Sequence, residues 1–512
     1  MLVQDFLHAS VERTPSRVAL ICDGQRLTYA QIEDMANRLA QALRAHGVKR
    51  GDRVAIHLGN GVEAAVSIFA VLKAGAAFVV INHSTKPDKR FYILNNCRAA
   101  ALVLDARNAA PGELEALRRS VPSLKCIVIS GEGAFEAING CAGHLGFDAI
   151  QKEFLSARPS PVNIDLDLAC LIYTSGSTGE PKGVMSDHDN VVFAAGSIIR
   201  YLQNTDGDVI LSALPLSFDY GLYQLLMTFQ FGGTLILENS FSFPALILKR
   251  IEQERVTGFP VVPTMVAMLL KMDLSSFDLS SLRYITNTAA ALPPSHVQEL
   301  RRKFPHVKLY SMYGLTETKR TLYLPPEQLD KRPGSVGIAI PGTEVWIEDE
   351  GGNRLGPNAV GELVVRGRHV MRGYWETPEA TAQRFRPGPL PGERLCYTGD
   401  LFRMDEEGYM YFVGRKDDII KSRGEKVAPK EVENVLYALK GVVEAAVVGI
   451  PDPIYGQAIK AVIVANGVKL TAATVLAHCA AHLEDHMVPK HVEFRQELPK
   501  TSTGKIKKTD LI

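Results

Sequence analysis

The stretch "DRVAIHLGNGVEAAVSIFAVLKAGAAFVVIN", residues 52–82, decides the fold class of this chain. Apolar residues dominate 54–58 and 77–81, which we expect to be strands, and an apolar segment of helical length occupies 62–74 between them. Glu63 and Lys73 interrupt the apolar run and Gly75 breaks it, so it does not fit a membrane span. A strand, a helix and a second strand in this order form a βαβ unit, which predicts parallel pairing in a layered α/β domain.

Similar alternation recurs along the chain. β-rich runs combine with amphipathic helical segments at 125–130, 207–215, 232–238, 256–270 and 281–304, and no short fixed period indicates a solenoid. From about residue 333 short alternating runs are separated by glycine-rich turns, as in antiparallel structure. We therefore expect an α/β fold with a large N-terminal domain, 1–416, made of layered α/β subdomains and a β-rich part at about 333–414. A small, mobile α+β domain is expected at 417–512.

Composition excludes several classes of function. The 57 basic and 56 acidic residues nearly cancel, so no global field favours nucleic acid or an anionic membrane as a partner. Seven cysteines are scattered without a C-x-x-C pair, which fits neither a disulfide framework nor a zinc cluster. The N-terminus has no basic segment followed by an apolar one, so no secretory signal is predicted and we expect a cytoplasmic protein.

A glycine-rich loop is the first candidate site. "LIYTSGSTGEPKGV", residues 171–184, places glycine and hydroxyl side chains after an apolar run, followed by one lysine. Small residues let backbone N–H groups approach anionic oxygens, and Lys182 adds a positive charge. The loop matches neither the Walker A pattern nor the dinucleotide-binding pattern. The predicted phosphate-binding residues are Thr174, Ser175, Gly176, Ser177, Thr178, Gly179 and Lys182.

Six further motifs follow a recognisable order. They are "LKAGAAFVVIN" (72–82), "MYGLTET" (312–318), "GELVVRG" (361–367), "YTGDL" (397–401), "GRKDDIIKSRGEKVAPKEVE" (414–433) and "PKTSTGKIKK" (499–508). Together with the glycine-rich loop they resemble the adenylate-forming superfamily of AMP-binding enzymes. That superfamily includes acyl-CoA synthetases, adenylation domains of nonribosomal peptide synthesis and luciferases. The resemblance covers essentially the whole chain.

The resemblance implies a reaction and a set of roles. ATP and Mg²⁺ would be the cofactors, a carboxylate would be joined to the α-phosphate of ATP, and the acyl group would then pass to a thiol. The implied catalytic residues are Lys182, Thr316, Glu317 and Lys505. Glu317 would bind Mg²⁺, and Lys505 would bridge the carboxylate and the α-phosphate. The implied nucleotide-binding residues also include Tyr313 and Gly314 near adenine, Asp400 and Arg415 near ribose, and Ala289 and Ala290 in place of a family glycine pair. Asp417 would be the hinge, and Gly424 would lie near the incoming thiol arm.

The acid is a separate question. Asp219, in "SFDYGL", resembles the aspartate that pairs with the substrate ammonium in amino-acid-activating domains. Because a buried carboxylate is costly unless it is paired, Asp219 suggests a substrate that bears an amine. The other implied pocket residues are Tyr220, Tyr223, Ile285, Asn287, Met312, Arg320 and Thr321. Arg320 would either bind a second substrate carboxylate or neutralise Asp219.

Two functions remain open at this point. The leading one is activation of an amino acid, with an acidic or β-amino acid as one alternative, and its transfer to the phosphopantetheine of a separate carrier protein. The alternative is an AMP-forming CoA ligase for an organic or fatty acid, with free CoA as the acceptor. A non-catalytic binding protein is a weaker third hypothesis, because Lys182, Glu317, Asp400 and Lys505 all match the family pattern.

Overall fold

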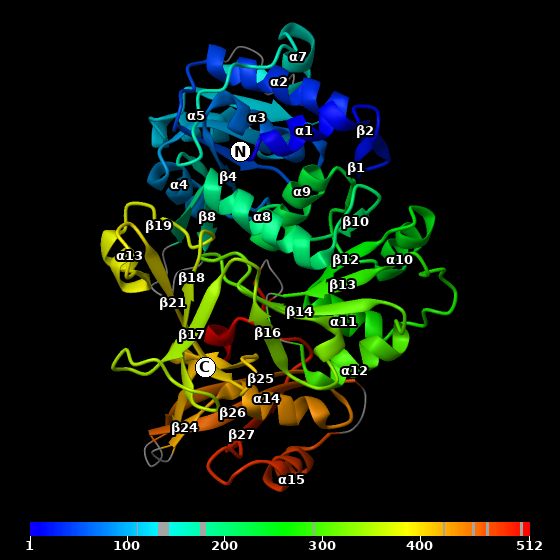
Figure 1. Ribbon diagram of the computed structural model, residues 1–512, viewed down its shortest axis with the longest axis vertical. Helices are drawn as coiled ribbons and strands as arrows, with labels where there is room; N and C mark the ends of the chain where they lie inside the picture. Colours follow the sequence, from blue (N-terminus) through cyan, green and yellow to red (C-terminus); the bar gives the residue numbers. More distant parts are fainter. Residues whose placement is uncertain are drawn as a thin grey trace. The chain divides into compact units, whose positions relative to one another are not determined.

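The βαβ unit predicted from residues 52–82 is confirmed by the computed structural model. Strand β3 (Arg53–His57), helix α3 (Val62–Ala74) and strand β4 (Ala77–Val80) follow one another, and the two strands pair in parallel, with Val54 opposite Phe78 (Figure 1). Gly75 ends the helix with a φ of 92°, a left-handed conformation that glycine adopts without strain. Among the residues that the structure describes, no helix is long and apolar enough to cross a membrane.

The structure describes residues 1–109, 111–131, 143–174, 181–288, 290, 292–422, 425–452, 456–466, 470–501 and 505–512. These residues form two compact units. The first consists of Met1–Pro260, Thr316–Lys319 and Gly367–Pro387, and the second of Val261–Leu315, Arg320–Arg366 and Gly388–Ile512. The predicted division of the chain at residues 416 and 417 stays a prediction.

The first unit contains an eight-stranded sheet in the order β19-β9-β8-β4-β3-β5-β6-β7. Besides β3 and β4, its strands are β5 (Ala99–Asp105), β6 (Cys126–Ser130), β7 (His144–Gly146), β8 (Leu168–Thr174), β9 (Lys182–Asp187) and β19 (Gly373–Tyr374). The pairs from β8 through β4, β3, β5 and β6 to β7 are parallel, and the pairs β8–β9 and β9–β19 are antiparallel. The βαβ prediction therefore describes the centre of this sheet.

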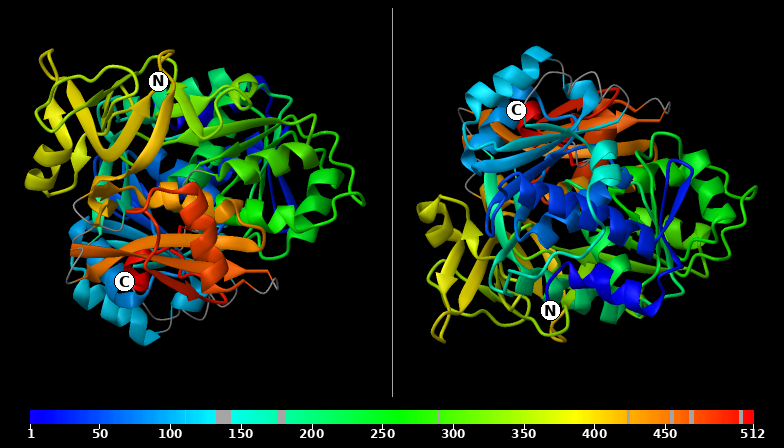
Figure 2. Two further views of the ribbon diagram at one scale, coloured as in Figure 1. Left: turned by 90° about the horizontal axis from the view of Figure 1, so that it is seen from below. Right: turned by 90° about the horizontal axis from the view of Figure 1, so that it is seen from above.

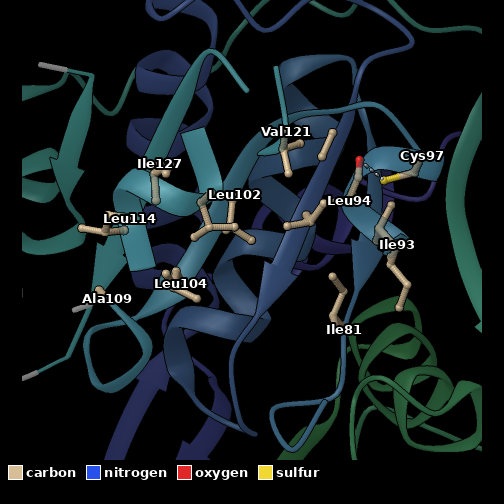
Figure 3. Packing of buried hydrophobic residues seen from close by; sticks show 14 of the residues in the cluster. Ile81, Ile93, Leu94, Cys97, Leu102, Leu104, Ala109, Leu114, Val121 and Ile127 are labelled. Atoms are coloured by element: carbon tan, nitrogen blue, oxygen red, sulfur yellow. Dashed lines mark hydrogen bonds between the residues drawn. The ribbon is translucent and has the colours of Figure 1, made fainter. Parts of the chain in front are cut away.

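Helices pack against the parallel strands, with α3 on β3 and β4 and α4 on β5. Besides α3, the helices described within the first 153 residues are α1 (Asp5–Arg13), α2 (Tyr29–Ala45), α4 (Pro87–Asn96), η1 (Ala106–Asn108), α5 (Pro111–Ser120) and α7 (Phe147–Glu153). Figure 3 shows apolar side chains from β5, α4 and α5, including Leu102, Leu94 and Leu114, meeting in one buried cluster. Because protein interiors are close-packed, truncating such a leucine to alanine lowers the free energy of unfolding by about 2–5 kcal/mol. This close packing gives the sheet a rigid base.

A second run of strands has the order β12-β10-β11-β1-β2, and apart from Val261 at the end of β12 it belongs to the first unit. These strands are β1 (Val18–Cys22), β2 (Gln25–Thr28), β10 (Val209–Ser212), β11 (Thr234–Leu237) and β12 (Gly258–Val261). β1, β10, β11 and β12 pair in parallel, and β2 is antiparallel to β1. The remaining elements of this unit are α8 (His188–Leu202), α9 (Asp219–Phe231), α10 (Pro244–Gln253), α13 (Pro378–Arg384) and β20 (Phe385–Pro387).

The second unit contains the β-rich part that the sequence predicts after residue 333. Its strand order is β17-β18-β21-β22-β16-β15-β14-β13, and of the pairs described only β13–β14 is parallel. The strands are β13 (Tyr284–Asn287), β14 (Lys308–Tyr313), β15 (Leu322–Leu324), β16 (Ser335–Ala339), β17 (Glu344–Glu348), β18 (Val360–Arg366), β21 (Arg394–Met404) and β22 (Met410–Arg415). The helices between them are α11 (Pro263–Leu270), α12 (Pro294–Lys303) and η2 (Pro326–Gln328).

The C-terminal segment has the predicted α+β character. Its strands β23 (Ile420–Ser422), β24 (Glu425–Val427), β25 (Val442–Asp452), β26 (Gly456–Ala465) and β27 (His491–Phe494) form one mixed sheet. Its helices are η3 (Lys416–Asp418), α14 (Pro429–Ala438), α15 (Ala472–His482) and η4 (Lys508–Leu511). Figure 2 shows these elements in orange and red, where α14 packs on β25 and α15 on α14 over a core that includes Val432, Val447 and Val475.

Candidate active site

The glycine-rich loop joins two antiparallel strands, β8 and β9. Thr174, the last residue of β8, lies opposite Lys182, the first residue of β9. Gly183 follows, and a Cβ at this position would lie 3.1 Å from the ring of Tyr173, so the close approach favours glycine. The predicted phosphate-binding residues Ser175, Gly176, Ser177, Thr178 and Gly179 lie outside the described residues. The hairpin thus fixes both ends of the loop.

Tyr374 brings Lys182 and Glu317 together in the first unit. The ammonium of Lys182 lies 5.7 Å from the centre of the Tyr374 ring, within the range of a cation–π interaction. The Tyr374 hydroxyl donates a hydrogen bond of 2.5 Å to Oε1 of the buried Glu317. We call these three residues the Lys182–Tyr374–Glu317 cluster. It places a cation over the ring of Tyr374 and a carboxylate at its hydroxyl.

Backbone pairing holds this cluster in place. Tyr374 lies on β19, opposite Val184 of β9, and the Trp375 N–H donates to the Gly183 carbonyl at 2.7 Å. Met371 N–H donates to the Glu317 carbonyl at 3.0 Å. Burial, and then the neighbouring Glu317 carboxylate, raise the pKa of Tyr374 well above its usual value, so its hydroxyl stays a donor. Sequence reasoning missed Tyr374, since nothing in residues 373–375 indicates a partner 57 positions away.

A second cluster lies in the second unit and consists of Tyr313, Asp400 and Arg415. The Tyr313 hydroxyl donates to Oδ2 of Asp400 at 2.6 Å, and Arg415 Nε lies 3.1 Å from Oδ1. Burial and the Asp400 carboxylate raise the pKa of Tyr313 well above its usual value. The Tyr313 ring packs edge-on against Phe402, with the centroids 4.9 Å apart. Gly314 and Thr316, the other predicted nucleotide-binding residues of this motif, are half-buried.

Neighbouring strands orient Asp400. It lies on β21 directly opposite Arg415 of β22, and the preceding Gly399 donates its N–H to Oε1 of Glu362 on β18 at 2.8 Å. Both Asp400 oxygens therefore have a protein partner, whereas the resemblance assigns both to ribose hydroxyls. Each carboxylate oxygen can accept more than one hydrogen bond, so the two arrangements are compatible. Sequence reasoning missed Glu362, whose role becomes visible only with the strand pairing.

Two of the predicted C-terminal residues, Lys505 and Asp417, are exposed. Thr501 N–H donates to the Lys505 carbonyl at 2.8 Å and Lys505 N–H to Thr501 Oγ1 at 3.2 Å, so two hydrogen bonds join the exposed Lys505 to Thr501. Asp417, the predicted hinge, is exposed on η3, directly after β22. Gly424, the predicted thiol-arm residue, lies outside the described residues. The roles of Lys505 and Asp417 stay predictions.

Three of the predicted acid-binding residues share helix α9. Asp219 is its first residue, where the helix dipole stabilises a negative charge, and Tyr220 and Tyr223 are buried on its first turns. A Cβ on Gly221 would lie 2.3 Å from the Pro215 carbonyl oxygen. The preceding loop therefore comes so close to the helix that only glycine, which has no side chain, fits at this position. This close approach fixes the start of α9, and with it Asp219.

The other five predicted acid-binding residues lie together in the second unit. Ile285 and Asn287 are two positions apart on β13 and so face the same side of the sheet, and Asn287 Nδ2 donates to the Ala290 carbonyl at 3.1 Å. Met312 lies near the end of the adjacent β14, and Thr321 N–H donates to the Tyr313 carbonyl at 2.9 Å. Arg320 is buried beside Thr321. Ala289 lies outside the described residues.

Comparisons with known proteins agree with the resemblance. The family model "AMP-binding enzyme" matches residues 7–375, and the model "AMP-binding enzyme C-terminal domain" matches residues 431–505. A feruloyl-CoA synthase of an Amycolatopsis species is 35% identical over 504 residues, covering 97% of this chain and 96% of that protein. A long-chain-fatty-acid–CoA ligase of Bacillus subtilis is 32% identical over 537 residues, covering 100% and 94%.

A solved structure shows the same fold. The ATP-bound MatB of Rhodopseudomonas palustris has a TM-score of 0.90 at 29% identity, with 100% of this chain and 98% of that chain covered. The feruloyl-CoA synthase and the long-chain-fatty-acid–CoA ligase are both named as enzymes that form CoA thioesters. The comparisons thus favour the CoA-ligase alternative over the amino-acid and carrier-protein hypothesis drawn from Asp219. This chain belongs to the AMP-binding enzyme family of the adenylate-forming superfamily, and it is an AMP-forming acid–thiol ligase.

Proposed function

We propose that this enzyme converts a carboxylic acid, ATP and CoA into an acyl-CoA, AMP and pyrophosphate. In the first step a carboxylate oxygen attacks the α-phosphorus of ATP, and pyrophosphate leaves. In the second step the CoA thiol loses its proton and its sulfur attacks the acyl carbon, so that AMP leaves with the carboxylate-derived oxygen. The Lys182–Tyr374–Glu317 cluster carries this proposal, because it combines a cation at the end of the glycine-rich hairpin with a buried carboxylate.

The cluster fits the phosphate end of a nucleotide. Lys182 and the loop from Thr174 to Gly179 would bind the β- and γ-phosphates, and Thr316 would donate to the α-phosphate. Glu317 offers the carboxylate oxygen that a hard cation prefers, and Mg²⁺ would there neutralise phosphate charge. Among the described residues, no group of three or more His, Cys, Asp or Glu side chains could hold a metal ion. Glu317 would therefore share Mg²⁺ with phosphate oxygens and water.

The second cluster fits the nucleoside end. Tyr313 and Gly314, with Ala289 and Ala290, would border adenine, and Asp400, already oriented by Tyr313 and Arg415, would accept from ribose hydroxyls. Lys505 would bring a positive charge to the substrate carboxylate and the α-phosphate during adenylation. After a rotation at Asp417, the segment around Gly424 would receive the thiol, so one site would serve both half-reactions.

An acid panel tests the proposal. Purified enzyme with ATP and Mg²⁺ is assayed for acid-dependent pyrophosphate exchange with fatty, aryl-propenoic, aryl-acetic and amino acids, and then for thioester formation with free CoA. We expect exchange with at least one acid that lacks an amine, followed by conversion of CoA to its thioester. Exchange without any CoA thioester, and transfer only to a phosphopantetheinylated carrier protein, would overturn the proposal in favour of carrier loading.

A further inference from the structure

Lys319 is a buried lysine to which the family resemblance assigns no role. It follows the "GLTET" motif directly, is only 1% exposed, and adopts a φ of 56°, in the left-handed region that residues with a side chain rarely occupy. Such backbone conformations persist where the surrounding structure over-determines them, often at functional sites. A buried ammonium is also costly unless negative charge lies nearby. The position of this lysine therefore calls for a counter-charge.

The surroundings of Lys319 point to Asp219. Its ammonium lies 6.0 Å from the centre of the Tyr223 ring. Tyr223 is four residues after Asp219 on α9, so the two side chains lie on the same face of that helix. Asp219 is itself 5% exposed. One face of α9 thus presents a buried carboxylate next to the aromatic ring over which the lysine lies.

The electrostatics of a third residue support this placement. Cys170, on β8, is fully buried, and burial is the main cause that raises the pKa of its thiol. The Lys319 ammonium acts to lower that pKa, while two carboxylates, Asp187 and then Asp219, act to raise it. Asp187 is ion-paired with Arg372, whose Nε lies 3.3 Å from Oδ1 of Asp187. Because Coulomb interactions weaken with distance, charges that act on one buried thiol lie in its neighbourhood. All of these residues belong to the first unit.

We infer that Lys319 is the internal counter-charge of Asp219 and that it makes this enzyme selective for acids without an ammonium group. This inference rests on the proposed function and on the predicted place of Asp219 in the acid site. If Lys319 already neutralises Asp219, a substrate ammonium would find no unbalanced carboxylate there. It would instead meet a second cation, and like charges in a buried site repel.

Matched acid pairs test the inference in the unaltered enzyme. Pyrophosphate exchange is measured with 3-phenylpropanoate against phenylalanine and with hexanoate against norleucine, pairs that differ only in the α-amine. For whichever skeleton is accepted, we expect kcat/KM to favour the acid without the amine by about 100-fold or more, because an unpaired buried charge carries that scale of penalty. Preference for the amino acid would overturn the inference.

Charge-pair variants test the assigned partner. Lys319→Met should lower kcat/KM for the amine-free acid at least about tenfold and narrow its advantage over the amino acid, since the positive charge assigned to Asp219 is then removed. In the Lys319→Met/Asp219→Asn double variant we expect part of the loss to be recovered, whereas losses that simply add would contradict the pairing. Lys319→Gln is a second variant in case Lys319→Met does not fold.

A buried lysine elsewhere in the same unit provides the control. Lys73 Nζ lies 2.8 Å from Oε1 of the buried Glu33. Lys73→Met should lower the melting temperature without changing the ratio between the paired acids, so the ratio separates selectivity from stability. Pyrophosphate exchange reports adenylation and needs no CoA, so it tests the role of Lys319 separately from the proposal that CoA is the acceptor. Amine-free selectivity without CoA transfer would refute only the proposed acceptor, and CoA transfer with amino-acid preference would refute only the role of Lys319.

Discussion

Replacing Tyr374 with phenylalanine tests the Lys182–Tyr374–Glu317 cluster with one atom removed. The Phe ring keeps the aromatic face near Lys182, but Glu317 loses the donor that lies 2.5 Å from its Oε1. A hydrogen bond to a buried charged group contributes about 1.5–3 kcal/mol, so a loss of about 2 kcal/mol corresponds to roughly a 30-fold fall in kcat/KM. We expect the fall to be accompanied by a higher Mg²⁺ requirement, since the carboxylate is no longer held.

The assay is pyrophosphate exchange over a range of Mg²⁺ concentrations, with the melting temperature measured in parallel. Tyr411→Phe is the matched control, because the Tyr411 hydroxyl donates to Oδ2 of Asp405 at 3.3 Å in the second unit. That variant should leave the exchange rate and the Mg²⁺ dependence unchanged. If Tyr374→Phe keeps the wild-type kcat/KM at every Mg²⁺ concentration, the cluster is not part of the phosphate site.

Three further predictions concern other parts of the chain. Asp400→Asn should raise the KM for ATP by about tenfold or more with little change in the KM for the acid, because the ion pair with Arg415 is lost; equal effects on both would contradict a nucleotide role. Lys505→Ala should suppress adenylation far more than thioester formation from supplied acyl-adenylate, and equal losses in the two half-reactions would refute the role assigned to it. Burial lowers the pKa of His369 to about 3, below the unfolded value near 6.5, so its contribution to stability is present above pH 6.5 and is lost as the pH falls. By pH 4.5 the loss amounts to about 3 kcal/mol, and denaturant titrations should show His369→Phe losing less stability than wild type over this range.

Local sequence pattern was sufficient to predict the fold class and the type of several elements. The apolar runs and glycine break in residues 52–82 predict β3, α3 and β4 to within one residue at each end, because strand and helix periodicity and the turn at Gly75 are local properties. Antiparallel structure after residue 333 follows in the same way from alternating runs and glycine turns. The order of strands in each sheet is not local, and the sequence did not predict it.

The site was harder to predict from the sequence, because it also depends on contacts between distant residues. Lys182, Glu317, Asp400 and Arg415 were chosen from motifs, but Tyr374 and Glu362 act through pairing between distant strands. Asp219 illustrates a different limit. A carboxylate at the start of a helix indicates a binding role only when its counter-charge is known, and the proposed counter-charge, Lys319, becomes apparent only from its burial and its contact with Tyr223.

The transfer of an oxygen atom tests the central claim most directly. An acid accepted by the enzyme is labelled with ¹⁸O in both carboxylate oxygens and incubated with ATP, Mg²⁺ and CoA, and the products are analysed by mass spectrometry. An acyl-adenylate intermediate predicts that one labelled oxygen appears in AMP for each acyl-CoA formed, with unlabelled pyrophosphate. Label in inorganic phosphate with formation of ADP would contradict the account, because the acid would then have been activated as an acyl phosphate.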